Sequence, residues 1–490
     1  MASPRHPAAR PAGAPPSAAP RVADAGTAAP PSAAARPWRR AFNSRPALLV
    51  AFAFAVMADP VSSVAYAIEA ALRALDGDLG LLLPTMGLVI GIIALIVTNY
   101  HVLVGRFAGG GDAAAAGAAF GEAWAFIPIG ALVVDFVLTI SISVSAAASA
   151  VIAYLPSLAY LRIPLALALL VAVAGLTWFG HIGRAVFAAM TLAFVALGGA
   201  VIVGGLGAAG AAGGSGTGAP PEPAPIAVLL AFPVAMALAT GVEAPSTAAA
   251  QLGQLDYAGR RRFARITLWL TLGIVGALTL GLTAVAVRLG VGIPPAHSTQ
   301  IAEIADASVG RVPFALFQAC TALLLLAAAS SSFQAGPGLL KALARRTGLV
   351  QDDDAGLLHH RLGIVNVHHT PYWSVAVFLA ISATVVVAAG ARDQELVLFY
   401  AVSVFMSFLM GLLSMARFSR RGRRWALLAV NCLGAGAVAL TLALNLARGY
   451  PVVSMAAALA IAFALYRLWV RDGRPRGISG AVVEAETRTG

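Results

Sequence analysis

The chain consists of long apolar runs separated by short polar segments. Each run is close to 20 residues long, the length that an α-helix needs to cross the hydrocarbon core of a bilayer. About twelve runs meet this criterion, and we expect each to form one membrane-spanning helix. They lie near residues 47–75, 81–100, 124–155, 163–179, 185–206, 226–250, 266–288, 313–335, 373–389, 395–416, 425–446 and 451–470.

Composition supports a membrane protein made of helices. Hydrophobic residues make up 59% of the chain, charged residues make up 11%, and the mean hydropathy is +0.84. Residues 1–44 differ, because they are rich in Ala, Pro and Arg and cannot bury enough apolar surface to fold. We predict a disordered tail over residues 1–44, a transmembrane domain over 45–470 and a short tail over 471–490.

The net charge is +12, but the location of the basic residues indicates a membrane orientation, and we expect no nucleic-acid partner. Most Lys and Arg residues fall in the N-terminal tail and in alternate loops, as the positive-inside rule requires. This distribution predicts a multi-pass protein of the cell (inner) membrane with both termini in the cytoplasm. The arginines expected on the opposite side are Arg73, Arg162, Arg288, Arg311, Arg392 and Arg448.

Two of the predicted spans carry a carboxylate beside a helix breaker. In the first span Asp59 precedes Pro60, and in the sixth span Gly241 and Glu243 precede Pro245. A charge inside the membrane is costly and is usually retained for function, while Pro and Gly interrupt a helix. We therefore expect both helices to break near the middle of the bilayer.

The two interrupted spans are separated by five span positions, so the two halves must cross the membrane in opposite directions. Paired interruptions at matching positions indicate an inverted-repeat transporter with its site at the breaks. We assign repeat one to residues 45–206, repeat two to 226–416, and two further helices to 425–470. Packing kinks without a transport role are the alternative explanation.

The third span contributes another polar face to this predicted site. Asp135, Thr139 and Ser143 follow one another at intervals of four residues, which places them on one side of a helix. Together with Asp59, Tyr66, Thr240 and Glu243 they supply carboxylate and hydroxyl oxygens, which suit a hard cation or a substrate ammonium. Carboxylates inside a membrane can also carry protons.

Four motifs resemble the amino acid–polyamine–organocation (APC) superfamily, and within it the KUP-type and Kim-type bacterial potassium-uptake branch. They are DPVSSVAY at Asp59–Tyr66, DFVLTISIS at Asp135–Ser143, ATGVEA at Ala239–Ala244 and LFYAVSVF at Leu398–Phe405. The resemblance covers residues 45–470 and implies a five-plus-five helix fold with broken helices 1 and 6. It also implies ion-binding roles for Asp59, Tyr66, Asp135, Thr139, Ser143, Thr240 and Tyr400, and a proton-coupling role for Glu243.

The resemblance is incomplete at the C-terminal end. The resembled potassium carriers typically have a sizeable cytoplasmic domain after the last span, whereas about twenty residues follow here. Their regulation and domain-mediated dimerisation therefore do not carry over, although a homodimer stays open. Many sequences of this type are described only as amino acid permeases.

The first break favours a cation as the transported solute. Amino acid carriers of this fold hold the substrate carboxylate on backbone N–H groups at a glycine-rich break. This chain has no glycine between Ala47 and Asp76, and it places Asp59 where that carboxylate would lie. We predict proton-coupled uptake of a monovalent cation, with potassium favoured, by alternating access; an amino acid or amine permease is the alternative.

Other features predict no additional chemistry. The acids lie deep in the spans and most histidines lie in loops, which disfavours a membrane enzyme. We expect no cofactor and no metal site beyond the transported potassium, with the lipid bilayer and the solute as partners. A short helix at the membrane surface is predicted over residues 294–308.

Overall fold

The computed structural model describes residues 45–107, 111–179, 184–208, 222–249, 252, 255–344 and 356–475. Contacts divide the chain into a first unit, residues 1–48, and a second unit, residues 49–490. The predicted tail over residues 1–44 lies outside the described residues. The membrane-spanning helices lie in the second unit from Leu49 onward.

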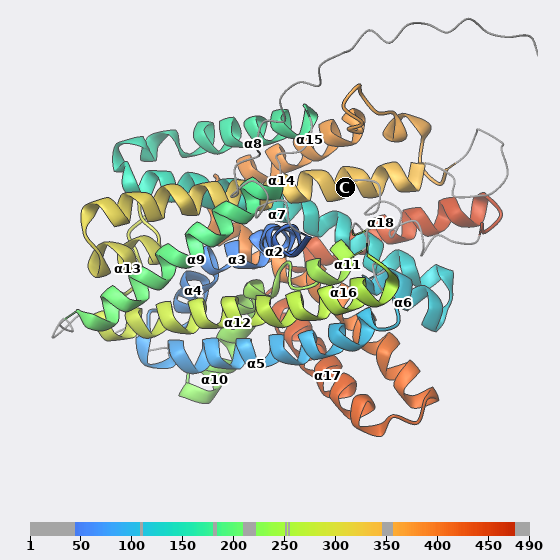
Figure 1. Ribbon diagram of the computed structural model, residues 1–490, viewed down its shortest axis with the longest axis horizontal. Coiled ribbons are helices and arrows are strands. Elements are labelled where there is room, and N and C mark those ends of the chain that lie inside the picture. The colour runs from blue at the N-terminus through green and yellow to red at the C-terminus, as the bar shows by residue number, and fades with distance from the viewer. Residues whose placement is uncertain are drawn as a thin grey trace, which may run out of the picture. The chain divides into compact units, whose positions relative to one another are not determined.

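The described residues fold into helices, and those of the second unit form a bundle of long, roughly aligned helices (Figure 1). The first part contains α2 (Arg45–Val56), α3 (Ala58–Ser62), α4 (Val64–Ala74), α5 (Leu79–Val104), α6 (Gly111–Phe120), η1 (Glu122–Ala125), α7 (Phe126–Tyr154), η2 (Pro156–Leu161), α8 (Arg162–Trp178) and α9 (Arg184–Gly207). The second part contains α10 (Ala224–Ala235), η3 (Met236–Ala239), α11 (Ala244–Ala248), α12 (Tyr257–Leu289), α13 (Gln300–Ser308), α14 (Arg311–Ala344), η5 (His360–Gly363), α15 (Tyr372–Ala388), α16 (Asp393–Arg421), α17 (Trp425–Ala447) and α18 (Val452–Arg471).

All predicted spans correspond to helical segments. Ten segments among the described residues are long and apolar enough to cross a membrane. The shorter apolar helix α15 and the first span, which is divided among α2, α3 and α4, complete the set. The prediction of an all-α membrane protein with interrupted first and sixth spans is confirmed.

Several helices are longer than their apolar runs predict. The helix α12 begins at Tyr257 rather than near residue 266, and α16 continues to Arg421 rather than ending near residue 416. At the start of α12, the Asp256 side chain accepts a hydrogen bond from the Gly259 backbone N–H at 2.8 Å. This cap lets the arginine-rich first turns stay helical. Hydropathy detects only the part of a helix that lies in lipid.

The centre of the second unit is built around α7 and α16. These two helices pack against each other, and α7 also packs against α14, α18 and α8. Most of their side chains are buried, whereas fewer than a third are buried in the apolar stretches of α8, α17 and α18. Exposed apolar residues such as Val171, Leu433 and Phe463 are suited to contact with lipid. The polar residues of α7 and α16 are therefore directed into protein.

The α-helices α13 and α6 lie outside the predicted spans. The helix α13 was predicted over 294–308 but begins at Gln300, because Pro294 and Pro295 lack donors and Thr299 caps the first turn through the Ala302 N–H. The helix α6 was not predicted. It is short and Ala-rich, and it packs against α16 and η1.

Candidate ion site

The two helix breaks differ in backbone conformation. Met57 and Ser63, which flank α3, keep right-handed helical angles, so the first break is an interruption without unwinding. The second break is unwound, since Thr240 is extended and Gly241 has a φ of +72°. The first span has no glycine, and a left-handed conformation is costly for other residues.

Pro60 lies within α3, and the first helix ends before it. Because Pro60 has no N–H to donate to the carbonyl of Val56, the hydrogen-bond ladder of α2 stops there. The expected break at Pro60 is therefore displaced by four residues toward the N-terminus. The Ser62 and Ser63 hydroxyls donate to the carbonyls of Asp59 and Pro60, at 2.7 Å each.

The two breaks lie against each other. A Cβ at Gly241 would come within 2.8 Å of Asp59 Oδ2 and 3.0 Å of the Pro60 ring. Ser63 Oγ also donates to the carbonyl of Leu238, just before the second break, at 3.2 Å. Gly241 is therefore required for both its backbone angle and its close approach to the Asp59 carboxylate. Pro245 lies in the first turn of α11, where its missing N–H leaves no helix hydrogen bond unmade.

The polar face of α7 meets α16. Asp135 and Thr139 are both buried, and the Thr139 hydroxyl lies 2.7 Å from the Tyr400 hydroxyl of α16. Tyr400 also lies close to Asp135, whose Oδ1 is buried without a hydrogen-bond partner. Ser143 lies one turn further along α7 and is buried. Asp135, Thr139 and Ser143 therefore share a protein-facing side of α7, as their spacing predicts.

The remaining predicted residues join the same region. Tyr66 of α4 is buried and lies close to Thr240 at the second break. Glu243 directly precedes α11, and its Oε2 is buried without a hydrogen-bond partner. The charges of Asp59, Asp135 and Glu243 are close enough to repel one another. We call these three carboxylates the central acids.

The central acids lack a basic partner in the described part of the chain. The ion pairs there join Arg73 to Glu69 and Arg471 to Asp472, and neither involves a central acid. Several buried carboxylates cannot all stay ionised together unless positive charge is supplied. Protons or a bound cation would meet this requirement, and the hydroxyls of Tyr66, Thr139 and Tyr400 add neutral oxygens.

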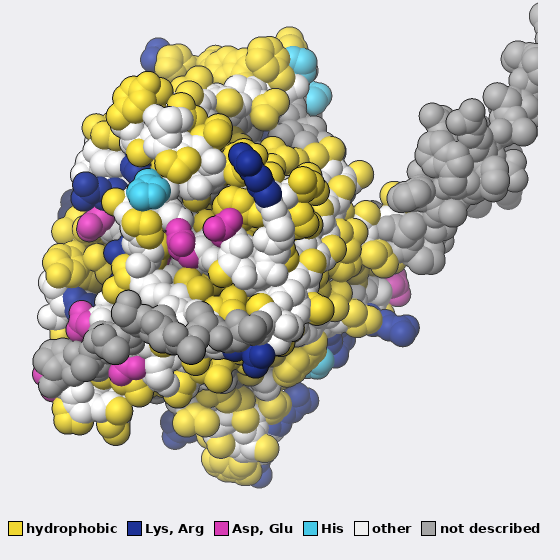
Figure 2. All heavy atoms as spheres, turned by 90° about the vertical axis from the view of Figure 1, so that its left-hand side faces the viewer, with side chains coloured by type: hydrophobic (Ala, Val, Ile, Leu, Met, Phe, Trp, Pro, Cys, Tyr) yellow, Lys and Arg dark blue, Asp and Glu magenta, His cyan; other side chains and the backbone are white. Residues whose placement is uncertain are grey.

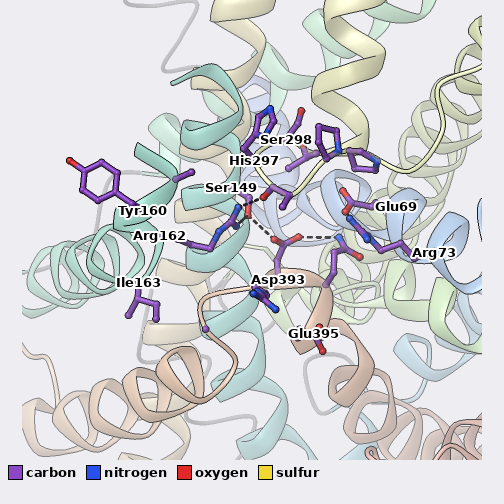
Figure 3. Close-up of a pocket in the computed structure, with 18 of the residues that line it drawn as sticks. Glu69, Arg73, Ser149, Tyr160, Arg162, Ile163, His297, Ser298, Asp393 and Glu395 are labelled. Carbon is purple, nitrogen blue, oxygen red and sulfur yellow. Dashed lines mark hydrogen bonds and ion pairs between the residues drawn. The ribbon is translucent and has the colours of Figure 1, made fainter. Parts of the chain in front are cut away.

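A cavity of about 810 Å³ opens at the end of the molecule that carries α13. We call it the vestibule. Figure 2 looks onto this end, where acidic, basic and histidine side chains interrupt the hydrophobic surface. Figure 3 shows side chains of α4, α7, α8 and α16 converging on it. Its charged and histidine side chains are Glu69, Asp393, Glu395, Arg73, Arg162, Arg392 and His297.

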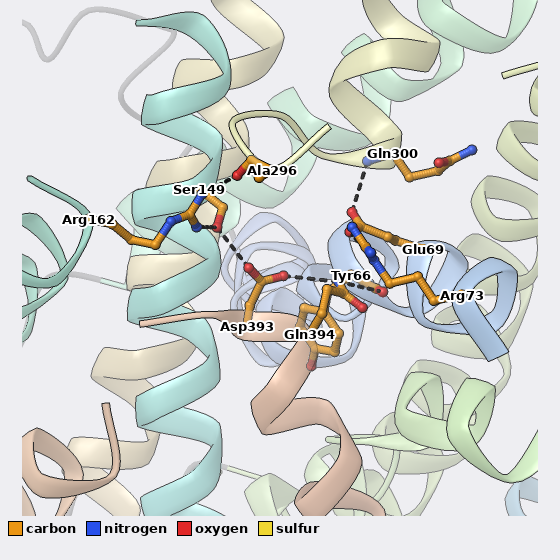
Figure 4. Close-up of polar contacts among 9 residues, drawn as sticks. All are labelled: Tyr66, Glu69, Arg73, Ser149, Arg162, Ala296, Gln300, Asp393 and Gln394. Atoms are coloured by element: carbon orange, nitrogen blue, oxygen red, sulfur yellow. Dashed lines mark hydrogen bonds and ion pairs between the residues drawn. The ribbon is translucent and has the colours of Figure 1, made fainter. Parts of the chain in front are cut away.

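A hydrogen-bonded chain crosses the vestibule (Figure 4). Arg162 donates to Ser149 Oγ and to the Ala296 carbonyl, each at 2.7 Å, and Ser149 donates to Asp393 at 2.7 Å. Gln394 donates to Asp393 at 3.0 Å and to the Tyr66 carbonyl at 3.4 Å. The chain thus links α7, α8, α16 and the segment before α13 to the helix that carries Tyr66.

Glu69 connects α4 to α13. Its carboxylate accepts from Arg73 Nε at 2.8 Å and from the Gln300 backbone N–H at 3.0 Å. Gln300 is the first residue of α13, so the carboxylate satisfies a free donor of that helix end. Hydropathy and spacing did not predict this contact or the Asp393 network. Asp393 in particular lies at the polar edge of its span, where a carboxylate is unremarkable in sequence.

A second buried acid escaped sequence analysis at the other end of the molecule. Asp112 of α6 is buried and accepts hydrogen bonds from Tyr100 at 2.6 Å and from Ser407 at 3.0 Å. The signal available was a single carboxylate opening the otherwise uncharged, Ala-rich run GDAAAAGAAF. The Ala-rich remainder of α6 is uncharged and packs easily into the protein, so Asp112 is buried together with it.

Comparison with known proteins supplies the family. The sequence profile described as "Amino acid permease" matches residues 48–479. A curated relative, "Potassium transporter KimA" of Bacillus subtilis (strain 168), is 29% identical over 380 residues. This match covers 71% of the present chain and 58% of the relative, so the chain spans little more than half of the relative's length.

Similar solved structures include a mutant of the manganese transporter of Eremococcus coleocola, 14% identical with a TM-score of 0.47. The same transporter bound to an aromatic bis-isothiourea substituted compound is 13% identical with a TM-score of 0.43. Each comparison covers 91% of this chain and 97% of the other. Because the profile matches most of this chain, residues 48–479, the chain belongs to the amino acid permease family of the APC superfamily and is a multi-pass membrane transporter.

Proposed function

We propose that this protein is a secondary transporter that couples the uptake of a monovalent cation, preferably potassium, to proton entry. The observation that carries the proposal is the cluster of central acids, which meets three hydroxyls and no basic side chain among the described residues. A zwitterion would bring its own carboxylate to this cluster, whereas a cation brings only the compensating charge.

The proposed ion ligands are Asp59, Tyr66, Asp135, Thr139, Ser143, Thr240 and Tyr400. Carboxylate, phenol and hydroxyl oxygens replace the hydration shell of a hard cation. Glu243 takes the coupling proton, because it lies at the unwound break and feels the charge of the other central acids. The potassium transporter at 29% identity supports the choice of ion.

The proposed orientation places the arginine-rich loops and both termini in the cytoplasm of the cell membrane. The vestibule then faces the outside, where it admits the cation. Entry is driven by the membrane potential, about 2.3 kcal/mol per charge for every 100 mV, and by the proton gradient. The working partners in this proposal are the bilayer, the ion and the proton, without a cofactor.

Flux of labelled rubidium into proteoliposomes tests the proposal directly. Purified protein is reconstituted, and uptake is driven by an inside-negative potential with or without an inward proton gradient. Uptake that is accelerated by the proton gradient and suppressed by unlabelled potassium supports the proposal. Rescue of a potassium-uptake-deficient bacterium at low potassium is the matching test in cells. Failure of rubidium to enter under either gradient would reject the cation assignment.

An amino acid or amine permease is the second candidate, favoured by the description of the matched family. In that case Asp59 would bind the amino group of the substrate. Competition by a mixture of amino acids and amines in the rubidium assay, together with uptake of the labelled mixture, separates the two candidates. Accumulation of a labelled amino acid without rubidium flux would establish the second candidate.

A further inference from the structure

Asp112 lies at the end of the molecule opposite the vestibule. Its helix, α6, is outside the membrane-spanning segments and follows the second span. The C-terminal end of α6 lies beside the arginine-rich end of α16, where Arg417 stands 5.2 Å from the Phe120 ring. In the proposed orientation, Asp112 therefore lies between the central acids and the cytoplasm.

The pocket around Asp112 is built to hold a carboxyl group. Tyr100 of α5 and Ser407 of α16 both donate to Oδ2, while Oδ1 is buried without a partner. Gly411 leaves room for the group, because a Cβ there would stand 2.1 Å from Oδ1. A buried carboxyl with one free oxygen can bind and release a proton there without breaking its existing hydrogen bonds.

The same pocket adjoins the second helix break. A Cβ at Gly111 would stand 3.2 Å from the Thr247 methyl group of α11, so α6 begins beside the short helix that Glu243 directly precedes. The charge of Asp112 acts on Glu243, and the Tyr100 hydroxyl feels both carboxylates. Like Asp112, Glu243 has one buried oxygen without a partner.

Among the described residues packed around α6, Tyr100 and Glu243 are the titratable neighbours of the Asp112 carboxyl. On α5, His101 is turned toward α12, where Trp269 donates to it. On α16, Arg417 meets the far end of α6. The neighbour η1 carries Glu122 beyond that same end, and α7 carries Asp135 among the central acids.

Burial raises the pKa of Asp112 to about 7, and the hydrogen bonds from Tyr100 and Ser407 oppose this rise. Both protonation states are therefore populated near neutral pH, which is the condition under which a carboxyl relays protons best. Removal of one donor to the ionised form is expected to raise the pKa further.

We propose that Asp112, held by Tyr100 and Ser407, is a second proton-binding site that carries the coupling proton from Glu243 to the arginine-rich side of the membrane. Protonated Glu243 gives its proton to a bridging water, a proton of that water forms the O–H bond on the Asp112 carboxylate, and Asp112 then releases the proton to water on the arginine-rich side. The inference rests on the proposed proton-coupled function. It assigns Asp112 no contact with the transported cation.

Asp112→Asn tests the relay, because it nearly preserves size and removes the exchangeable proton. Two fluxes are measured in proteoliposomes: net rubidium uptake driven by a proton gradient, and one-for-one rubidium exchange at equal pH. Exchange uses the binding site and alternating access but does not require a proton to leave the protein. We expect net uptake to fall about tenfold or more while exchange stays within about twofold of wild type.

Ser407→Ala is the matched variant, because it keeps the carboxyl group and removes one donor. It should retain net uptake and shift the pH at half-maximal uptake upward. Loss of both fluxes in Asp112→Asn would show a purely structural role, and retention of both would show no role; either result overturns the relay. If wild-type protein shows rubidium exchange but no proton-driven uptake, the coupling proposal fails first, independently of Asp112.

Discussion

The central acids and the acids of the vestibule are the same residue types in opposite surroundings. In the vestibule, Glu69 accepts from Arg73 and from a helix end, and Asp393 accepts from Ser149 and Gln394. Among the central acids, Asp135 and Glu243 each retain a buried oxygen without a partner. Partnered acids stabilise one arrangement of helices, whereas unpartnered acids are available to a passing ion or proton.

The largest effect is expected from removing a central charge. Asp135→Asn should reduce rubidium uptake to background, because the site loses one of the negative charges that compensate for lost hydration. The comparison variant is Asp393→Asn in the vestibule, which keeps an acceptor for Ser149 and should retain most uptake. Both are measured in proteoliposomes at equal protein content. Equal losses in the two variants would erase the distinction between central and vestibule acids.

The next effect concerns the contact between the breaks. Gly241→Ala should lower uptake about tenfold, because it adds the strain of a positive φ and places a methyl group against the Asp59 carboxylate. Gly91→Ala in α5 is the control, since a Cβ there meets nothing within 4 Å. Uptake by Gly241→Ala at the wild-type rate would mean that the breaks need not approach this closely during transport.

The sequence predicted the spans and the central acids because both depend on patterns within one helix. Apolar length predicted the helices, and intervals of four residues placed Asp135 and Thr139 together. The sequence did not show that the backbone keeps helical angles at the first break but is unwound at the second. That distinction depends on Gly241, whose positive φ unwinds the second span, whereas the first span has no glycine. Asp112 and the Ser149–Asp393 bond were missed because they depend on long-range packing.

A smaller effect is expected at the rim of the vestibule. Arg162→Gln keeps donors for Ser149 and Ala296 but removes a positive charge beside Asp393. The vestibule becomes more negative, so the KM for rubidium should fall by about twofold at low ionic strength and approach wild type at high salt. The kcat should change little, because Arg162 bonds Ser149 and Ala296 and none of the central acids. A KM shift that persists at high salt would indicate altered packing instead of altered charge.

The smallest effect is a change in the pH dependence of stability through Asp112. Its pKa is raised to about 7 from an ordinary value of 3.8, so folding favours the protonated form. The associated stability is fully present below the ordinary pKa and is lost as pH rises through about 7. In detergent, the melting temperature of wild type should therefore fall more between pH 5 and pH 8 than that of Asp112→Asn. Altered hydrogen bonds in the variant shift its melting temperature by a constant offset, whereas only loss of the carboxyl flattens the slope. Parallel slopes would mean that Asp112 stays in one protonation state across this range, which is incompatible with a proton relay at neutral pH.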